Sequence, residues 1–108
     1  MNLRSEVSGR DRRSLWAVVT LDGDLRIEGQ DLGPEVERIF GAGQTEYEWD
    51  VVVRAANVPQ AVVALGGAPG DDALTLLQQR YSGRSASEVE RRLEAAGVPT
   101  EFWSRIGD

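Results

Sequence analysis

Three carboxylates alternate along one short stretch of the chain, at a spacing that suits acid–base chemistry. The stretch is EYEWDVVVRA, residues 46–55, in which Glu46, Glu48 and Asp50 occupy every second position. Residues two apart on a β-strand point to the same face and lie about 7 Å from each other. A carboxylate pair at such a spacing can hydrolyse a glycosidic bond, provided that a pocket raises the pKa of one member.

The same ladder has two simpler interpretations. In the first, the ladder is an ordinary solvated face of an edge strand. A small domain that exposes this face offers no pocket, and charges along an edge strand discourage aggregation. Alternatively, the ladder is a docking surface for a basic partner. Trp49 lies in the same stretch but alternates to the opposite face, so we do not expect it to share a site with Glu48 and Asp50.

Two absences narrow the chemistry. The chain has no Cys and no His, which excludes disulfides, thiolate metal sites and Ser–His or Cys–His catalysis within one chain. The segment DGDLRIEG at 22–29 is not a calcium loop, because Arg26 stands where an oxygen ligand is required. We therefore assign no catalytic residue, no metal and no cofactor.

Acidic residues are concentrated in the central third of the chain. Residues 22–50 hold nine acidic residues against Arg26 and Arg38, and the whole chain has a net charge of -6. An acidic surface repels nucleic acid and membrane phosphates and attracts basic partners. We therefore predict a basic protein as partner and no membrane contact, and the negative charge disfavours nucleic acid as a partner. The predicted partner-binding residues are Asp24, Glu28, Glu46, Glu48 and Asp50.

The N-terminal half predicts three strands and one helix. Residues 1–13 have no apolar period and are predicted as a flexible arm. Strands over 15–21 and 25–28 form a hairpin around Asp22 and Gly23, in a register that pairs Ile27 with either Val18 or Val19. A helix follows, with Pro34 in its first turn and Gly41 at its end. The connection that contains this helix is long enough for a crossover, so we expect the third strand, 46–55, to lie on the far side of the first strand.

The C-terminal half predicts helices over 57–66, 71–81 and 85–97, the last with a capping box of Ser85 and Glu88, and a final helical turn over 100–108. Residues 14–108 are thus a single α+β domain: a three-stranded antiparallel sheet of order 2-1-3 with an inserted helix and two to three C-terminal helices. The predicted core is Trp16, Val18, Ile27, Val36, Phe40, Trp49, Val51, Val53, Val62, Leu65, Leu74, Leu77, Val89, Leu93 and Phe102.

Three segments resemble small hypothetical proteins encoded in actinobacterial genomes. They are GQDLGP at 29–34, EYEW at 46–49 and FWSRIGD at 102–108, and the resemblance extends over most of residues 14–108. No activity is established for that group, so the resemblance implies no catalytic role for any residue here.

These observations favour a non-enzymatic protein-binding module in the cytoplasm, similar in size and charge to immunity proteins and antitoxin-like inhibitors of basic partners. Two alternatives stay open. One is a small-ligand-binding protein or carboxylate-based enzyme, which needs a buried carboxylate in a concave pocket. The other is a DNA-associated regulator that uses a helical hairpin over 71–96, although its second helix carries three glutamates beside Arg91 and Arg92. The oligomeric state is not assigned.

Overall fold

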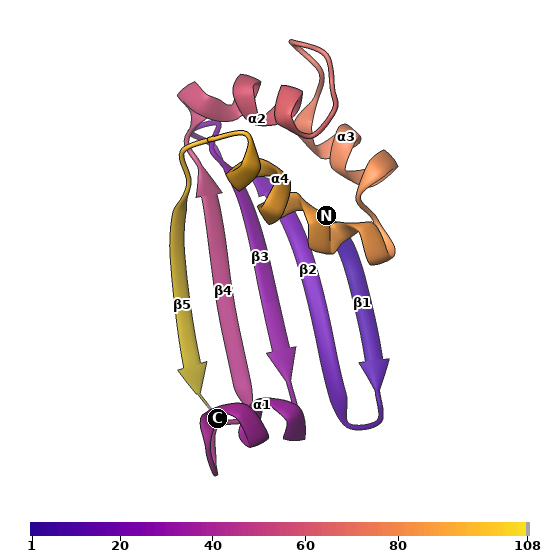
Figure 1. Cartoon of the computed structure of the whole chain (residues 1–108), viewed down its shortest axis with the longest axis vertical. Coiled ribbons are helices and arrows are strands. Elements are labelled where there is room, and N and C mark those ends of the chain that lie inside the picture. The colour runs from indigo at the N-terminus through magenta and orange to yellow at the C-terminus, as the bar shows by residue number, and fades with distance from the viewer. Residues whose placement is uncertain (108) are drawn as a thin grey trace.

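The computed structural model describes residues 1–107, and for Arg84 the backbone alone. Five antiparallel strands form one sheet in the order β1-β2-β3-β4-β5, so every strand pairs with the strand that precedes or follows it (Figure 1). The strands are β1 (Asn2–Ser8), β2 (Asp11–Val19), β3 (Leu25–Leu32), β4 (Glu46–Val53) and β5 (Glu101–Gly107).

Most of the helical structure lies between β4 and β5 and packs against one face of the sheet (Figure 1). These elements are the 3-10 turns η1 (Ala55–Asn57) and η2 (Gly83–Glu88) and the helices α2 (Val58–Ala64), α3 (Ala73–Arg80) and α4 (Val89–Ala95). We call α2, α3, η2 and α4 the helical layer, and the uncovered side of the sheet the open face. Helix α1 (Pro34–Phe40) connects β3 to β4 at the end of the sheet opposite α2 (Figure 1).

The predicted sheet of three strands in the order 2-1-3 is wrong. The α1 connection returns the chain to the neighbouring position, where β4 pairs with β3. The position beyond β2 is occupied by β1, because the segment predicted as a flexible arm turns at Gly9 (φ 63°) and pairs with β2. The C-terminal segment predicted as a helical turn is β5, which pairs with β4. The α+β class is retained.

The register of the β2–β3 hairpin differs from both predicted registers. Ile27 pairs with Ala17, and residues 20–24 form a longer loop, closed by a 2.9 Å hydrogen bond from the Thr20 amide to the Asp24 carbonyl. Relative to the Val18 register, this one-residue shift exchanges the two faces of β2, whereas the Val19 register would have assigned the same side chains to the helical layer. Ala17 is buried, whereas Trp16, which was predicted in the core, lies on the open face.

Several helix ends follow the sequence signals, and one does not. Helix α1 begins at Pro34 and is capped by Gly41, as predicted. The Asp72 side chain caps α3 by accepting a 2.9 Å hydrogen bond from the Thr75 amide. The capping box at Ser85 is absent: the Ser85 hydroxyl donates to carbonyls of the preceding turn, and α4 begins only at Val89.

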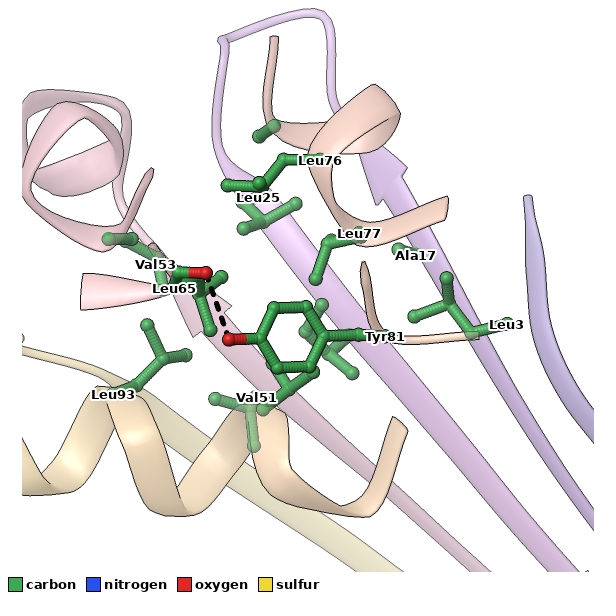
Figure 2. Close-up of a cluster of buried hydrophobic side chains, with 14 of the residues drawn as sticks. Leu3, Ala17, Leu25, Val51, Val53, Leu65, Leu76, Leu77, Tyr81 and Leu93 are labelled. Atoms are coloured by element: carbon green, nitrogen blue, oxygen red, sulfur yellow. Dashed lines mark hydrogen bonds between the residues drawn. The ribbon is translucent and has the colours of Figure 1, made fainter. Parts of the chain in front are cut away.

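The core lies between the sheet and the helical layer (Figure 2). Tyr81 reaches into it, and its hydroxyl donates a buried 2.9 Å hydrogen bond to the Leu65 carbonyl. The Trp49 ring packs over Gly29, where a Cβ atom would lie 2.1 Å from the ring. Phe40 and Phe102, both predicted in the core, are exposed. The largest fully buried side chains are Leu25, Leu65, Leu77, Leu93, Val53 and Val89.

Leu77→Ala tests this core. The Leu77 side chain is 0% exposed, so its truncation leaves a cavity and is expected to lower the free energy of unfolding by about 2–5 kcal/mol. Leu21→Ala is the matched control, because Leu21 is fully exposed in the β2–β3 loop; it should change stability by less than about 0.5 kcal/mol. Urea denaturation measures both, and equal effects would contradict this packing.

Candidate functional site

The open face carries a row of two carboxylates between two tryptophans. Trp16 pairs with Glu28, Glu28 with Asp50, and Asp50 with Trp103, so one residue from each of β2, β3, β4 and β5 stands in line. Side chains of directly paired residues project to the same face. We call Trp16, Glu28, Asp50 and Trp103 the Trp–acid row. The row borders a shallow hollow of about 270 Å³, which is lined by Trp16, Glu28, Gly29, Gln30, Glu48, Asp50 and Trp103.

Most carboxylates on the open face already have partners within the chain. Arg105 lies 3.3 Å from Glu48 and 3.8 Å from Glu46, and the Gln30 amide donates a 3.0 Å hydrogen bond to Glu46. The pKa of Glu48 is lowered, chiefly by hydrogen bonding with the Glu46 carboxyl and further by Arg105.

The middle of the Trp–acid row is less well satisfied. The nearest Arg26 nitrogen is 3.8 Å from Glu28, which is an ion pair without a hydrogen bond. The Asp50 carboxylate makes no hydrogen bond or ion pair with any residue in the described part of the chain. Of the predicted partner-binding residues, Asp50 is therefore the one whose carboxylate is available to an external donor.

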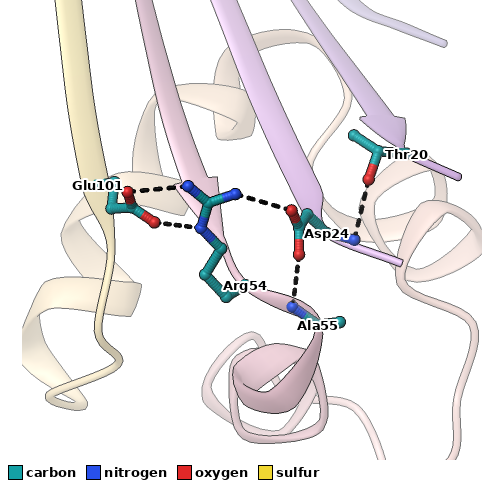
Figure 3. Close-up of polar contacts among 5 residues, drawn as sticks. All are labelled: Thr20, Asp24, Arg54, Ala55 and Glu101. Carbon is teal, nitrogen blue, oxygen red and sulfur yellow. Dashed lines mark hydrogen bonds and ion pairs between the residues drawn. The ribbon is translucent and has the colours of Figure 1, made fainter. Parts of the chain in front are cut away.

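Asp24, also predicted to bind a partner, is held in a network of hydrogen bonds and ion pairs at the end of the sheet next to η1 (Figure 3). Its carboxylate accepts hydrogen bonds from the Ala55 amide at 2.8 Å and from Arg54 at 2.9 Å. Arg54 also donates to both carboxylate oxygens of Glu101. The Ala55 amide and Arg54 lower the pKa of Asp24, and Arg54 lowers that of Glu101. We call Asp24, Arg54 and Glu101 the arginine clip.

A second hollow, of about 230 Å³, lies on the opposite face between the sheet and the η2–α4 segment. We call it the inner hollow. Asp31 lines it, and burial raises the pKa of this half-buried carboxyl, against the opposing effect of Arg13. The Arg13 guanidinium is 4.0 Å from the Asp31 carboxylate and makes no hydrogen bond to the described residues. Arg13 also lines the inner hollow. The other residues that line the inner hollow are Arg4, Ser14, Leu15, Ile27, Trp49, Val51, Ala86, Ser87, Val89, Glu90 and Leu93.

Sequence reasoning placed Glu28, Glu46, Glu48 and Asp50 on one acidic surface, and the structure brings them together on the open face. It missed Trp16, because the predicted core followed the register that pairs Val18 with Ile27, and Trp103, because β5 was predicted as a helical turn. It also missed the inner hollow. Ile27, Gly29 and Asp31 are alternate residues of β3, and this pattern would have predicted that Asp31 faces the same side of the sheet as the buried Ile27.

Two arginines of the helical segment considered for DNA binding, Arg91 and Arg92, are held in ion pairs. Arg91 and Arg92 lie 3.0 and 3.6 Å from Glu88, and Arg92 also stands over the Tyr81 ring. Phosphate binding by this segment would have to break these contacts, so the geometry does not favour the DNA-associated alternative.

The comparisons with known proteins give no relative: no family model, curated protein or solved structure matches the chain. Of the FWSRIGD segment, Asp108 lies outside the described residues. Within residues 1–107, no group of three or more acidic side chains is arranged to hold a metal ion. None of the helices described there is long and apolar enough to cross a membrane.

Asp31→Asn is expected to change how stability depends on pH. Because burial raises the pKa of Asp31 above its unfolded value of 3.8, the folded protein binds more protons between the two pKa values. The contribution of Asp31 to stability is therefore complete below the unfolded pKa and falls as pH rises through the folded pKa. Asp31→Asn should consequently stabilise the protein more at about pH 7 than at about pH 4.

Asp72→Asn is the control of opposite sign. Hydrogen bonds from the Thr75 hydroxyl and amide lower the pKa of Asp72, so its contribution to stability is lost as pH falls. Urea denaturation of wild type and both variants at the two pH values measures the differences. An effect of Asp31→Asn that is the same at both would contradict the placement of Asp31.

Proposed function

We propose that the protein is a non-enzymatic binding module whose open face docks onto a basic surface of another protein. The Trp–acid row carries this proposal. Asp50 stands without a partner among the described residues, Glu28 lies beside it on the neighbouring strand, and Trp16 and Trp103 flank the pair.

The chemistry of the row suits an arginine or lysine side chain. A guanidinium or ammonium group placed between Glu28 and Asp50 gains two charge-assisted contacts. An indole ring attracts a cation that lies over its face, with about 0.5–1 kcal/mol for each exposed cation–π contact, and Trp16 and Trp103 flank the carboxylate pair. Trp103 is 51% exposed, and exposed tryptophans are over-represented among residues that dominate binding energy.

The charge of the whole chain supports the same partner class. A net charge of -6 accelerates the encounter with a basic protein and makes it sensitive to salt. Inhibitors that cover a basic nuclease share this small size and acidity, so a basic enzyme is the proposed partner class. The arginine clip already satisfies Asp24, and this supports a contact at the middle of the sheet rather than at its Asp24 end.

Reversal of two charges in the row tests the proposal. Glu28→Lys combined with Asp50→Lys should weaken binding of a basic partner at least about tenfold, because both contacts with the cation become repulsive. The control is Glu90→Lys with Glu94→Lys on α4, which changes the net charge equally on the other side of the sheet. Circular dichroism confirms that each variant is folded.

The measurement is affinity capture from lysate of the source organism at low salt, with mass spectrometry of the salt eluate. The expected result is a basic protein that wild type and the α4 control retain and the row variant does not. Equal retention by all three proteins, or retention of no basic protein by wild type, would contradict the proposal.

The inner hollow supports a second candidate function, the binding of a small amphipathic anion. Its floor is apolar, from Leu15 and Val51 to the Trp49 ring, and Arg13 at its rim has no hydrogen-bond partner among the described residues. An aromatic or aliphatic body would rest on the floor while a carboxylate or sulfonate binds the guanidinium.

The fluorescent anion 8-anilinonaphthalene-1-sulfonate is a suitable probe of this hollow. Arg13→Ala should weaken its binding several-fold by removing a charge-assisted hydrogen bond. Arg12→Ala is the matched control, because Arg12 is adjacent in sequence but does not line the inner hollow. Fluorescence titration gives both affinities, and equal affinities for the two variants would count against this site.

A further inference from the structure

Strand β5 is an uncovered edge with apolar side chains on both of its faces. Phe102 pairs with Val51 and so points to the side of the helical layer, yet it is 58% exposed, and no residue of β5 is buried. Ile106 lies on the same side and is also exposed, and Trp103 is exposed on the open face. The outer backbone groups of β5 have no strand partner among the described residues.

The opposite edge of the sheet is protected. Strand β1 has a register irregularity between Asn2 and Arg4, and η2 packs against it. Its leucine, Leu3, is buried in the core. Bulges and covering segments are the usual means by which a sheet edge is kept from pairing with another chain. Strand β5 has no irregularity in its register with β4 and is not covered.

The sequence of β5 is complementary to itself. In an antiparallel pair of two β5 strands with Ser104 opposite Ser104, Phe102 faces Ile106 of the other copy and Trp103 faces Arg105. The first pair is apolar, and the second places a guanidinium beside an indole ring, both of which are favourable cross-strand pairs. The Arg105 guanidinium donates by one edge to Glu48, which leaves its planar face free to stack.

We infer that β5 is a homodimer interface, in which two copies of the chain pair antiparallel through residues 101–107 with the twofold axis at Ser104. The pairing satisfies the outer backbone groups of β5 and removes the exposed edge. It also joins the two open faces, so that the Trp–acid rows of both copies lie on one continuous sheet. The inference rests on the edge strand alone and does not need the proposed function, although Trp103 belongs both to this strand and to the Trp–acid row.

A single cysteine tests both the dimer and its register, since the chain has no other. In Ser104→Cys the two sulfurs would face each other across the axis, where antiparallel Cα atoms are about 4.5–5.5 Å apart, within the range of a disulfide. Val7→Cys is the control, because Val7 is exposed on the β1 edge. Both variants are equilibrated in a glutathione redox buffer and resolved on a non-reducing gel, and the mass of wild type is measured by sedimentation equilibrium.

The expected mass at about 200 µM is twice the 11.8 kDa of one chain. The expected covalent dimer of Ser104→Cys is at least about tenfold more abundant than that of Val7→Cys, owing to the high effective concentration of the paired sulfurs. A wild-type mass of one chain at this concentration overturns the dimer. A dimeric mass with equal crosslinking of the two variants overturns the assignment to β5.

Discussion

The burial of apolar side chains between the sheet and the helical layer is the interaction on which the other features depend. Leu25 and Val53 from the sheet meet Leu65, Leu77 and Leu93 from the helical layer, and all five are essentially inaccessible to solvent. Only one face of the sheet takes part. The alternation of each strand therefore sends every second side chain to the open face, where it contributes nothing to the core and is free to serve in recognition.

The fold was predictable where local signals agree with tertiary packing. The proline and glycine that bound α1, and the alternation that buries Val51 and Val53, are readable from the sequence. The two edge strands were not. In β1 only Leu3 is buried, and β5 has no buried residue, so neither shows the apolar alternation of a half-buried strand. Their identity depends on pairing with β2 and β4, which a single sequence does not reveal.

The candidate site was predictable in its charges and not in its surroundings. The acidic alternation of β4 shows that Glu48 and Asp50 share a face, and this follows from strand geometry alone. Whether a carboxylate is free or paired depends on long-range neighbours. Arg54, for example, binds Glu101 of β5, and Arg105 of β5 binds Glu48. An error in one strand, β5, therefore conceals both the arginine clip and the second tryptophan of the row.

The arginine clip joins parts of the chain that come together at different stages of folding. Arg54 and Glu101 are 47 positions apart, and the whole helical layer lies between them. Strands β2 to β4 each pair with their predecessor, at a low cost in loop-closure entropy, whereas β5 must close a long loop before it gains any contact. It also has no buried residue with which to resist opening. Within one copy of the chain, we therefore expect β5 to join the sheet last and to leave it first, with backbone amides that exchange with solvent before those of β2 and β3.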